Sequence, residues 1–335
     1  MKILCCYTFD WEKEYIQKQL AGHDFVFVRG TIRDCSPMPD PTVDGLCVFI
    51  DSPITSSVFS KFPNLKFIAT RSSGFDHIDT AVAKKRDIVI SNVPAYGKYA
   101  VAEYTFALML SLSRKIYQAC NLTRQGIFAD DTLMGFDLNG KILGVVGTGA
   151  IGSQVIQIAK AFGMQVIACD AKPDQARATN LGFTYVALDE LLKQADIVTL
   201  HVCYNQSTHH LINSTNISSM RAGSYLINTS RGQVIETMAL VKGIEEKILA
   251  GVALDVFEEE AALVDQVSVL ADKKAAVNKL QTLVANYYLA HHPRVLASPH
   301  NAYNSIEARR DIWDVTAGNI KAFAAGKPVN VAVCD

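Results

Sequence analysis

The stretch KILGVVGTGAIGSQVIQIAKAFGMQVIACD, residues 141–170, decides the fold of this chain of 335 residues. Its apolar run Ile142–Val146 predicts a buried strand, and a helical pattern over Ala150–Phe162 follows a glycine-rich turn. A second apolar run then ends at Asp170. Strand, turn, helix and strand in this order predict a βαβ unit of a parallel sheet.

Three glycines in the turn, Gly147, Gly149 and Gly152, have the spacing GxGxxG. The first permits a tight turn, the second lets the backbone approach a pyrophosphate, and the third lets helix and strand pack closely. The start of the helix, with Ala150 and Ile151, offers unpaired N–H groups and the positive end of its dipole to phosphates. The turn therefore predicts a dinucleotide site.

Asp170 lies 18 positions after Gly152, where a carboxylate can accept hydrogen bonds from the hydroxyls of the adenosine ribose. A carboxylate at this point would repel the 2′-phosphate of NADP. Lys172 and Arg177 lie nearby but do not follow the acid directly. We therefore predict NAD, rather than NADP, as the cofactor.

Short apolar runs alternate with helical patterns along almost the whole chain. We expect strands within residues 2–9, 44–50, 65–72, 87–93, 141–147, 165–170, 196–202, 224–230 and 250–257. Strands separated by helices predict an α/β fold in which parallel sheets are covered on both faces, and the length allows two such doubly wound domains.

Two loops, NVPAYG at 92–97 and SPHNAYNS at 298–305, divide the chain, and the dinucleotide motif lies between them. We therefore expect one domain inserted in another. The substrate domain would comprise residues 1–98 plus 299–335, and the NAD-binding domain residues 99–298.

Two further segments carry structural expectations. The run KYAVAEYTFALMLSLSRKIYQA, residues 98–119, predicts one long helix that is apolar around much of its circumference. Such a helix must be buried, either between domains or against another subunit. Residues 260–294, rich in Ala, Leu, Val and Lys, predict a helical elaboration rather than a site of chemistry.

Composition narrows the class of partner. The chain is 49% hydrophobic and 19% charged with a net charge of −1 and both signs interspersed, so we expect a small-molecule partner and no nucleic acid. The N-terminus lacks the apolar core of a signal peptide, and no apolar run is long enough to span a membrane. Eight scattered cysteines without a CxxC pair predict reduced thiols in a cytoplasmic protein. We expect no metal site.

Several motifs, in this order and spacing, resemble the D-isomer-specific 2-hydroxyacid dehydrogenases. They are RSSGFDHID (71–79), NVPAYGKYAVAE (92–103), GTGAIG (147–152), INTSRG (227–232), LDVFEEE (254–260) and SPHNAYNS (298–305). The resemblance spans nearly the whole chain and is strongest to the D-lactate dehydrogenase branch. It implies a Rossmann NAD-binding domain inserted in a flavodoxin-like substrate domain.

The resemblance also implies a catalytic set of Arg231, Glu260 and His300. Histidine suits proton transfer to a substrate oxygen, a neighbouring glutamate favours its charged form, and arginine can bind a carboxylate with its planar fork. The run EEE alone predicts a solvated surface cluster. Only the interval from Arg231 and the match to the motif select Glu260, and Glu258 and Glu259 stay a surface run.

Substrate contacts follow from the same resemblance. The family holds the substrate carboxylate with backbone amides around Ser73 and Gly74, and Tyr96 matches a tyrosine that contacts substrate in the D-lactate branch. Tyr303, three residues after His300, is a candidate for the side-chain pocket, although packing explains this aromatic residue equally well.

Cofactor contacts beyond the glycine turn are expected where strands end. Asp255 matches a family position near the nicotinamide carboxamide. His201 and Val202 end one strand, and Cys203 follows them. Thr229 ends another strand, and we expect all four to face NAD, with a core role for His201 as the alternative.

Two departures from related branches support this assignment. Phosphoglycerate dehydrogenases usually have proline after the acidic motif, whereas this chain has Ala261 and a long insertion. Formate dehydrogenases of this fold place glutamine where this chain has Glu260.

The predicted function is NAD-dependent reduction of pyruvate to D-lactate by a homodimer built through the cofactor domains, with substrate between the domains. One alternative is a dehydrogenase of a larger D-2-hydroxy acid. Another is an NAD-sensing regulator resembling the C-terminal-binding corepressors, which would bind NADH yet turn over little. The chain ends soon after its final helix, without the tail that such regulators often carry, so we favour the enzyme.

Overall fold

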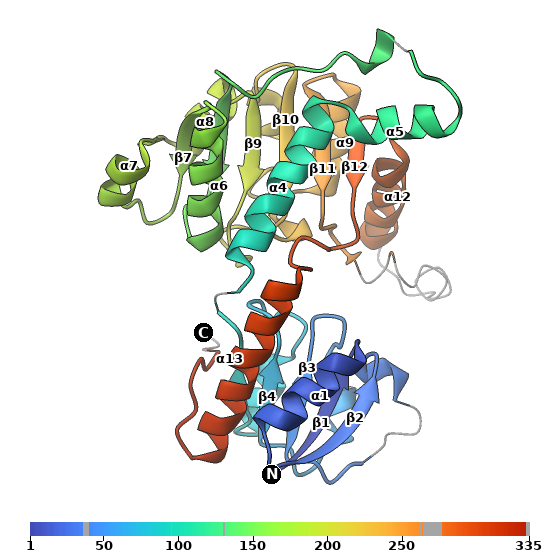
Figure 1. Cartoon of the computed structure of the whole chain (residues 1–335), viewed down its shortest axis with the longest axis vertical. Coiled ribbons are helices and arrows are strands. Elements are labelled where there is room, and N and C mark those ends of the chain that lie inside the picture. The colour runs from blue at the N-terminus through green and yellow to red at the C-terminus, as the bar shows by residue number, and fades with distance from the viewer. Residues whose placement is uncertain (36–39, 95, 130, 261–262, 264–276, 333–335) are drawn as a thin grey trace. The chain divides into compact units, whose positions relative to one another are not determined.

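Two separate parallel sheets organise the chain, which the computed structural model describes over residues 1–35, 40–94, 96–129, 131–260, 263 and 277–332. Unit 1 comprises Met1–Gly97 and Ser305–Asp335, and unit 2 comprises Lys98–Asn304 (Figure 1). Residues 299–304 therefore fall in unit 2.

Unit 1 has a sheet of five parallel strands in the order β2-β1-β3-β4-β5. The strands are β1 (Lys2–Tyr7), β2 (Asp24–Arg29), β3 (Gly45–Val48), β4 (Phe67–Thr70) and β5 (Val89–Ser91). This order is that of flavodoxin-like folds. Apolar residues of α1 (Asp10–Gln19) and α13 (Ile306–Ala324) pack on one face, and those of α2 (Ser56–Phe59) and α3 (Thr80–Lys85) pack on the other.

Unit 2 has a sheet of seven parallel strands in the order β12-β11-β10-β9-β6-β7-β8. The strands are β6 (Ile142–Val146), β7 (Gln165–Cys169), β8 (Thr184–Tyr185), β9 (Ile197–Leu200), β10 (Ser224–Asn228), β11 (Leu249–Leu254) and β12 (Val295–Ala297). From β8 onward this is the Rossmann order with one strand added. The order reverses between β6 and β9, and ligands of such sheets bind at the carboxyl ends of the strands at that point.

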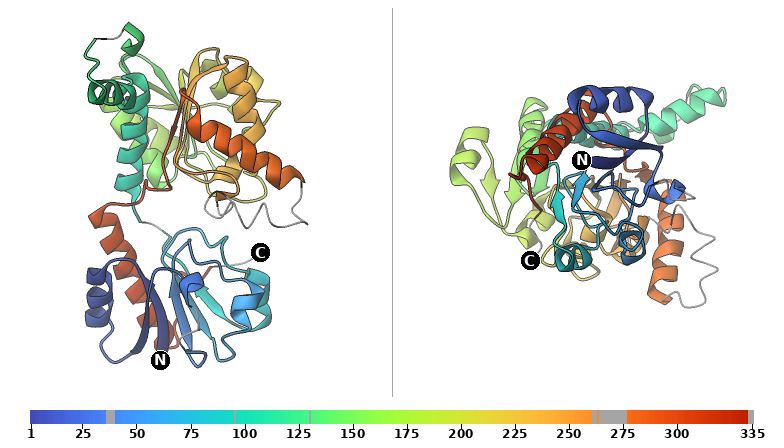
Figure 2. Two further views of the ribbon diagram at one scale, coloured as in Figure 1. Left: turned by 90° about the vertical axis from the view of Figure 1, so that its right-hand side faces the viewer. Right: turned by 90° about the horizontal axis from the view of Figure 1, so that it is seen from below.

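Helices cover both faces of the larger sheet (Figure 2). One face packs against α4 (Lys98–Ser113) and α6 (Ala150–Ala161). The other packs against α8 (Leu188–Gln194), α9 (Thr237–Glu245) and α12 (Val277–His291). The expected fold class, two doubly wound parallel-sheet domains, is therefore confirmed.

The helix expected over residues 98–119 is not continuous, and this prediction is wrong. The chain forms α4, passes through Lys115 in the left-handed region with φ 51°, and then begins α5 (Ile116–Arg124). A returning segment explains the break, because the backbone N–H of Phe136 donates to the Ser113 carbonyl at 2.9 Å. A continuing helix would need that carbonyl for its own next turn.

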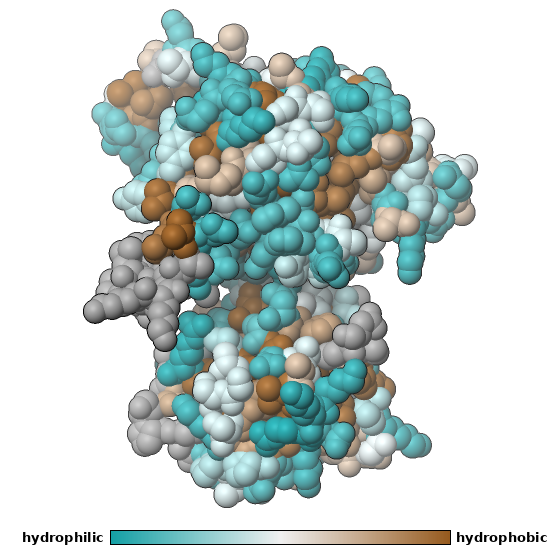
Figure 3. All heavy atoms as spheres, turned by 180° about the vertical axis from the view of Figure 1, so that it is seen from behind, coloured by the Kyte–Doolittle hydropathy of each residue, from teal (hydrophilic) through white to brown (hydrophobic). Residues whose placement is uncertain are grey.

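Apolar side chains gather on α5 and on the segment that follows it (Figure 3). Ile116, Tyr117, Ile127, Phe128 and Met134 are all exposed, and Phe128 is 84% exposed. Of residues 260–294, the structure describes 260, 263 and 277–294, where α12 forms; the rest of the predicted helical elaboration lies outside the described residues. Within the described ranges, no helix has the length and apolar character needed to cross a membrane.

Candidate functional site

The glycine turn lies at the carboxyl end of β6, beside the point where the strand order reverses. Gly147 has φ +92°, and a side chain there would place its Cβ 2.5 Å from the His201 carbonyl oxygen. A Cβ on Gly152 would lie 2.0 Å from the Gly147 oxygen. A Cβ on Gly149 would meet nothing within 4 Å among the described residues, which leaves open space above the turn.

This geometry fits a dinucleotide pyrophosphate. Gly147 makes the turn, Gly152 lets the helix pack on it, and Gly149 leaves room for a ligand to approach the backbone. Helix α6 begins at Ala150, with Gly149 as its N-cap, so the first N–H groups of Ala150 and Ile151 face the same end of the sheet.

Asp170 follows β7, and two backbone N–H groups and one hydroxyl hold its carboxylate in place. Thr148 donates to Oδ2 from its N–H at 2.6 Å and from its hydroxyl at 2.9 Å, and the N–H of Lys172 donates to Oδ1 at 2.8 Å. Burial alone would raise the pKa of Asp170, but these hydrogen bonds outweigh it and lower the pKa. The Arg177 guanidinium donates to the Thr148 carbonyl at 2.5 Å and lies 3.4 Å from the Asp174 carboxylate. An ionised acid therefore stands at the carboxyl end of β7, and its contact with a ribose stays a prediction.

His201 and Val202 follow β9 and lie against the glycine turn. The ring Nε2 of His201 lies 2.9 Å from the Thr199 hydroxyl, and burial lowers the pKa of His201 to about 3, so the ring is neutral. Val202 Cγ1 would lie 3.0 Å from a Cβ on Gly147. Cys203 is exposed. These positions suit the predicted cofactor contacts, which stay predictions.

Thr229 follows β10 at the same edge of the sheet. It is 9% exposed, and its hydroxyl lies 3.1 Å from that of Thr105 on α4. The hydroxyl is therefore bonded to a helix of its own unit, and contact with NAD stays a prediction.

Glu260 and His300 are brought together from distant parts of the chain. Glu260 Oε2 lies 3.0 Å from His300 Nδ1. The other oxygen of Glu260 accepts from the N–H of Phe257 at 3.1 Å, which folds the glutamate back over its own turn. His300 has φ 49°, uncommon for a residue other than glycine, and its ring packs edge-on against Tyr303 with 6.3 Å between centroids.

Asp255 organises the loop that carries His300. Its fully buried carboxylate accepts hydrogen bonds from the Ser298 hydroxyl at 2.6 Å and from the N–H groups of Asn301 and Ala302, each at 2.8 Å. Its carbonyl accepts from the N–H of His300 at 2.8 Å. Asp255 therefore holds the loop through residues before and after His300. Its contact with nicotinamide stays a prediction.

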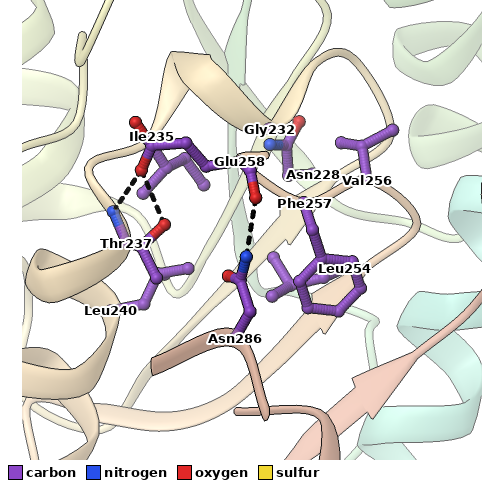
Figure 4. A pocket seen from close by; sticks show the side chains of 10 residues that line it. All are labelled: Asn228, Gly232, Ile235, Thr237, Leu240, Leu254, Val256, Phe257, Glu258 and Asn286. Atoms are coloured by element: carbon purple, nitrogen blue, oxygen red, sulfur yellow. Dashed lines mark hydrogen bonds between the residues drawn. The ribbon is translucent and has the colours of Figure 1, made fainter. Parts of the chain in front are cut away.

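Arg231 lies in the turn after β10. Asn228 donates from its side chain to the Arg231 carbonyl at 2.9 Å, and the guanidinium donates to the Ser230 carbonyl at 2.8 Å. The next residue, Gly232, touches the segment that leads to Glu260: a Cβ there would lie 1.9 Å from the carbonyl carbon of Phe257. Figure 4 shows Gly232, Asn228 and Phe257 around one small cavity.

The three consecutive glutamates have three different partners. Glu258 accepts from the Thr237 hydroxyl at 2.7 Å and lies 2.7 Å from His210 Nε2, with a side chain only 15% exposed. Glu259 is exposed and lies 3.3 Å from Lys279. The expectation of a surface run is therefore wrong for Glu258.

The other expected substrate contacts lie in unit 1. Ser73 is exposed in the loop after β4, where its carbonyl accepts from the Asn92 side chain at 2.7 Å. The Gly74 carbonyl accepts from the Ser72 hydroxyl at 2.6 Å. Tyr96 is partly buried in the loop after β5. Their roles toward substrate stay predictions.

Four side chains of the site escaped the sequence interpretation. They are Thr148, Asn228, His210 and Glu258. Thr148 holds Asp170, and Asn228 holds the turn of Arg231. His210 and Glu258 contact each other. Asn228 ends a buried strand at the ligand edge of a parallel sheet, and that position was a usable signal. The other three act through partners far along the chain, which local patterns do not reveal.

Known proteins are similar to the chain throughout its length. Residues 106–302 match the family described as D-isomer specific 2-hydroxyacid dehydrogenase, NAD binding domain. A 2-hydroxyacid dehydrogenase homolog of Zymomonas mobilis is 33% identical over 98% of each chain, and a D-lactate dehydrogenase of Escherichia coli is 31% identical over 98% of each. A D-lactate dehydrogenase from Aquifex aeolicus, solved with NAD and lactic acid, aligns with a TM-score of 0.83 at 34% identity, covering 97% of this chain and 96% of that one.

Proposed function

The chain belongs to the D-isomer-specific 2-hydroxyacid dehydrogenases, and from that premise we propose that it reduces pyruvate to D-lactate. It is an NAD-dependent oxidoreductase. The observation that carries the proposed chemistry is the contact of 3.0 Å between Glu260 Oε2 and His300 Nδ1. The choice of pyruvate rests on the similarity to proteins named D-lactate dehydrogenases.

We propose unit 2 as the NAD-binding domain and unit 1 as the substrate domain. The glycine turn and the first turn of α6 would hold the pyrophosphate, and Asp170 would accept from the adenosine ribose hydroxyls. When bound, NADH supplies the hydride that reduces the substrate carbonyl carbon. The remaining chemistry falls to the side chains of the protein.

His300 is proposed as the proton donor. Because Nδ1 is paired with the Glu260 carboxylate, Nε2 is the ring nitrogen left to donate to the substrate oxygen. The imidazolium is the form of the ring that can give a proton. In the direction of lactate oxidation, the neutral ring would accept that proton.

Arg231 is proposed to bind the substrate carboxylate and carbonyl oxygen. Its guanidinium presents several donors in one plane and stabilises negative charge as it develops on the carbonyl oxygen. Asn228 and the close approach of Gly232 to Phe257 fix the turn from which it projects. Backbone amides around Ser73 and Gly74, with Tyr96 and Tyr303, complete the proposed substrate contacts.

We further propose a cytoplasmic homodimer. The exposed apolar side chains of α5 and the segment after it, among them Tyr117 and Phe128, support association through unit 2. The cysteines in the described part of the chain are free thiols. Cys5 and Cys47 are free even though they lie opposite each other on paired strands. Free neighbouring thiols are typical of a reducing compartment.

A panel of 2-oxo acids of increasing size, assayed with NADH and followed by chiral analysis of the product, tests the function. We expect the highest kcat/KM with pyruvate and D-lactate as the product. L-lactate would contradict the stereochemical assignment, and a higher kcat/KM for a branched or aromatic acid would replace pyruvate as the substrate.

A further inference from the structure

The carboxylate of Glu258 joins two parts of unit 2. Its Oε1 lies 2.7 Å from His210 Nε2. Its Oε2 accepts from the hydroxyl of Thr237 at 2.7 Å and from the Thr237 N–H at 3.2 Å. Thr237 is the first residue of α9, so the carboxylate also satisfies an N–H group that the helix leaves unpaired, at the positive end of its dipole.

The backbone of Glu258 is fixed as firmly as its side chain. Asn286, on α12 and 1% exposed, donates from its side chain to the Glu258 carbonyl at 2.6 Å (Figure 4). A Cβ on Gly232 would lie 2.2 Å from the Glu258 nitrogen, so the Arg231 turn packs directly on this peptide. The loop of His210, two helices and the arginine turn therefore meet at one residue.

This fixed point lies at the start of the turn that carries Glu260. Glu259, the residue between them, has φ 55°, a conformation that side chains other than glycine seldom adopt and that its surroundings must hold in place. The direction in which Glu260 leaves the turn follows from that conformation. Glu260 then reaches Phe257 N–H with one oxygen and His300 with the other.

We propose that Glu258 is a positioning residue, whose carboxylate fixes the turn that aims Glu260 at His300. The inference rests on the proposed function in that it gives Glu260 and His300 their catalytic roles. Loss of the Glu258 anchor would let Glu259 relax and would lengthen the contact between Glu260 and His300. A misplacement of about 1 Å can lower a catalytic rate by as much as about 10².

Glu258→Gln tests the inference, because it keeps the shape of the side chain and removes its charge. Glu259→Gln is the matched control, since it makes the same change one residue along, on an exposed side chain paired with Lys279. Glu260→Gln marks the effect of losing the partner of His300 outright. His210→Asn, which removes one contact of Glu258, is a second and milder variant should Glu258→Gln fold poorly.

Two readouts separate positioning from simple stability. The first is the pH midpoint of the His300 ring titration, followed by NMR without substrate or cofactor; His300→Asn identifies the signal. The second is kcat and KM for pyruvate and for NADH. Other titratable groups lie beside His300 and Glu258 and also influence the curve. Glu260, Asp255 and Tyr303 lie beside His300. His210, with the His209 ring stacked on it, lies beside Glu258.

We expect Glu258→Gln to move the His300 midpoint to lower pH, in the direction of Glu260→Gln, and to lower kcat about 10-fold with KM for NADH unchanged. His210→Asn should move the midpoint the same way by less, and Glu259→Gln should match the wild type. A Glu258→Gln midpoint equal to that of the wild type would overturn the inference, even if the variant melts at a lower temperature. A wild type that reduces no 2-oxo acid would instead overturn the proposed function, and the ring titration would still decide on positioning.

Discussion

His300 Nδ1 lies 3.0 Å from Glu260 Oε2, although 40 positions separate the two residues in the chain. Other residues hold both of the segments that carry this pair. Asp255 holds the loop of His300 through a fully buried carboxylate, and the turn of Glu260 is fixed by the contacts of Glu258 and Gly232. A pair held in this way keeps its geometry before substrate arrives, which suits the proton transfer that we propose for it.

Replacing His300 should affect turnover and leave cofactor binding intact. His300→Asn removes the proposed proton donor, so kcat should fall by at least about 10², which corresponds to about 2.7 kcal/mol of barrier. The affinity for NADH, measured by fluorescence titration, should stay within about threefold because the glycine turn and Asp170 are untouched. A variant that retained most of its kcat would remove His300 from the mechanism.

Asp170 should set the preference for NAD. Burial would raise its pKa, but hydrogen bonds outweigh burial and lower it, so the acid is charged at neutral pH and, in the proposed site, would repel a 2′-phosphate. Asp170→Ala should reduce the ratio of kcat/KM for NADH to that for NADPH by at least about tenfold, since a hydrogen bond to a charged group contributes about 1.5–3 kcal/mol. Asp189→Ala, an exposed acid on α8, is the control. An unchanged ratio in Asp170→Ala would contradict the assigned role.

Glu12 should be essential to the stability of unit 1. It is 1% exposed and lies 2.9 Å from Arg309 and 4.0 Å from the buried Arg71. Glu12→Gln would leave these guanidinium groups without their carboxylate, which costs about 3–5 kcal/mol of unfolding free energy for a buried pair. Urea denaturation at pH 7 measures the difference, with the exposed Glu14→Gln on the same helix as control.

The contribution of Glu12 should also depend on pH. Burial would raise the pKa of Glu12, but Arg71 and the backbone N–H groups of Phe9 and Thr8 outweigh it and lower the pKa below 4.5. A lowered folded-state pKa adds stability above the unfolded value, and this stability is lost as pH falls through the folded value. The difference between wild type and Glu12→Gln should therefore shrink below about pH 4.5. A difference that stayed constant or grew would contradict the ion-pair account.

Gly232 should tolerate no side chain. An added Cβ would lie 1.9 Å from the carbonyl carbon of Phe257, so Gly232→Ala must push apart the turns that carry Arg231 and Glu260. We expect kcat to fall by about 10² and the unfolding free energy by about 1–3 kcal/mol. Gly318→Ala, where an added Cβ meets nothing within 4 Å among the described residues, is the control. Normal turnover by Gly232→Ala would show that the two turns are not coupled.

Local patterns predicted most of the sheet. All nine expected strands form. Each is an apolar run, and in a sheet covered by helices on both faces such a run is buried. β8 and β12, of two and three residues, were missed, whereas β5, also of three residues, was found because it lies in the longer run DIVISNV. β2, with the sequence DFVFVR, is a short run of aromatic and β-branched residues between two charged ones, and it could have been found. The break between α4 and α5 was not predictable, since it depends on a hydrogen bond from Phe136.

The residues of the site also divide into those that local spacing predicts and those that depend on distant partners. The glycine turn and Asp170 belong to one contiguous βαβ unit, so spacing alone predicted them. Glu260 was selected from three neighbouring glutamates only by resemblance to a family. The structural difference among the three lies in partners from distant segments, His300, Lys279 and His210, and no period within the run EEE encodes them.

The pH dependence of kcat/KM for pyruvate in Glu260→Gln, compared with Glu259→Gln and the wild type, tests the central claim most directly. In the proposed mechanism, reduction needs a protonated His300, so kcat/KM should fall as pH rises through the midpoint of that group. Without the charge of Glu260 the imidazolium is less favoured, and the account predicts that Glu260→Gln alone moves this fall to lower pH and loses rate. A Glu260→Gln profile that coincides with those of Glu259→Gln and the wild type would contradict it.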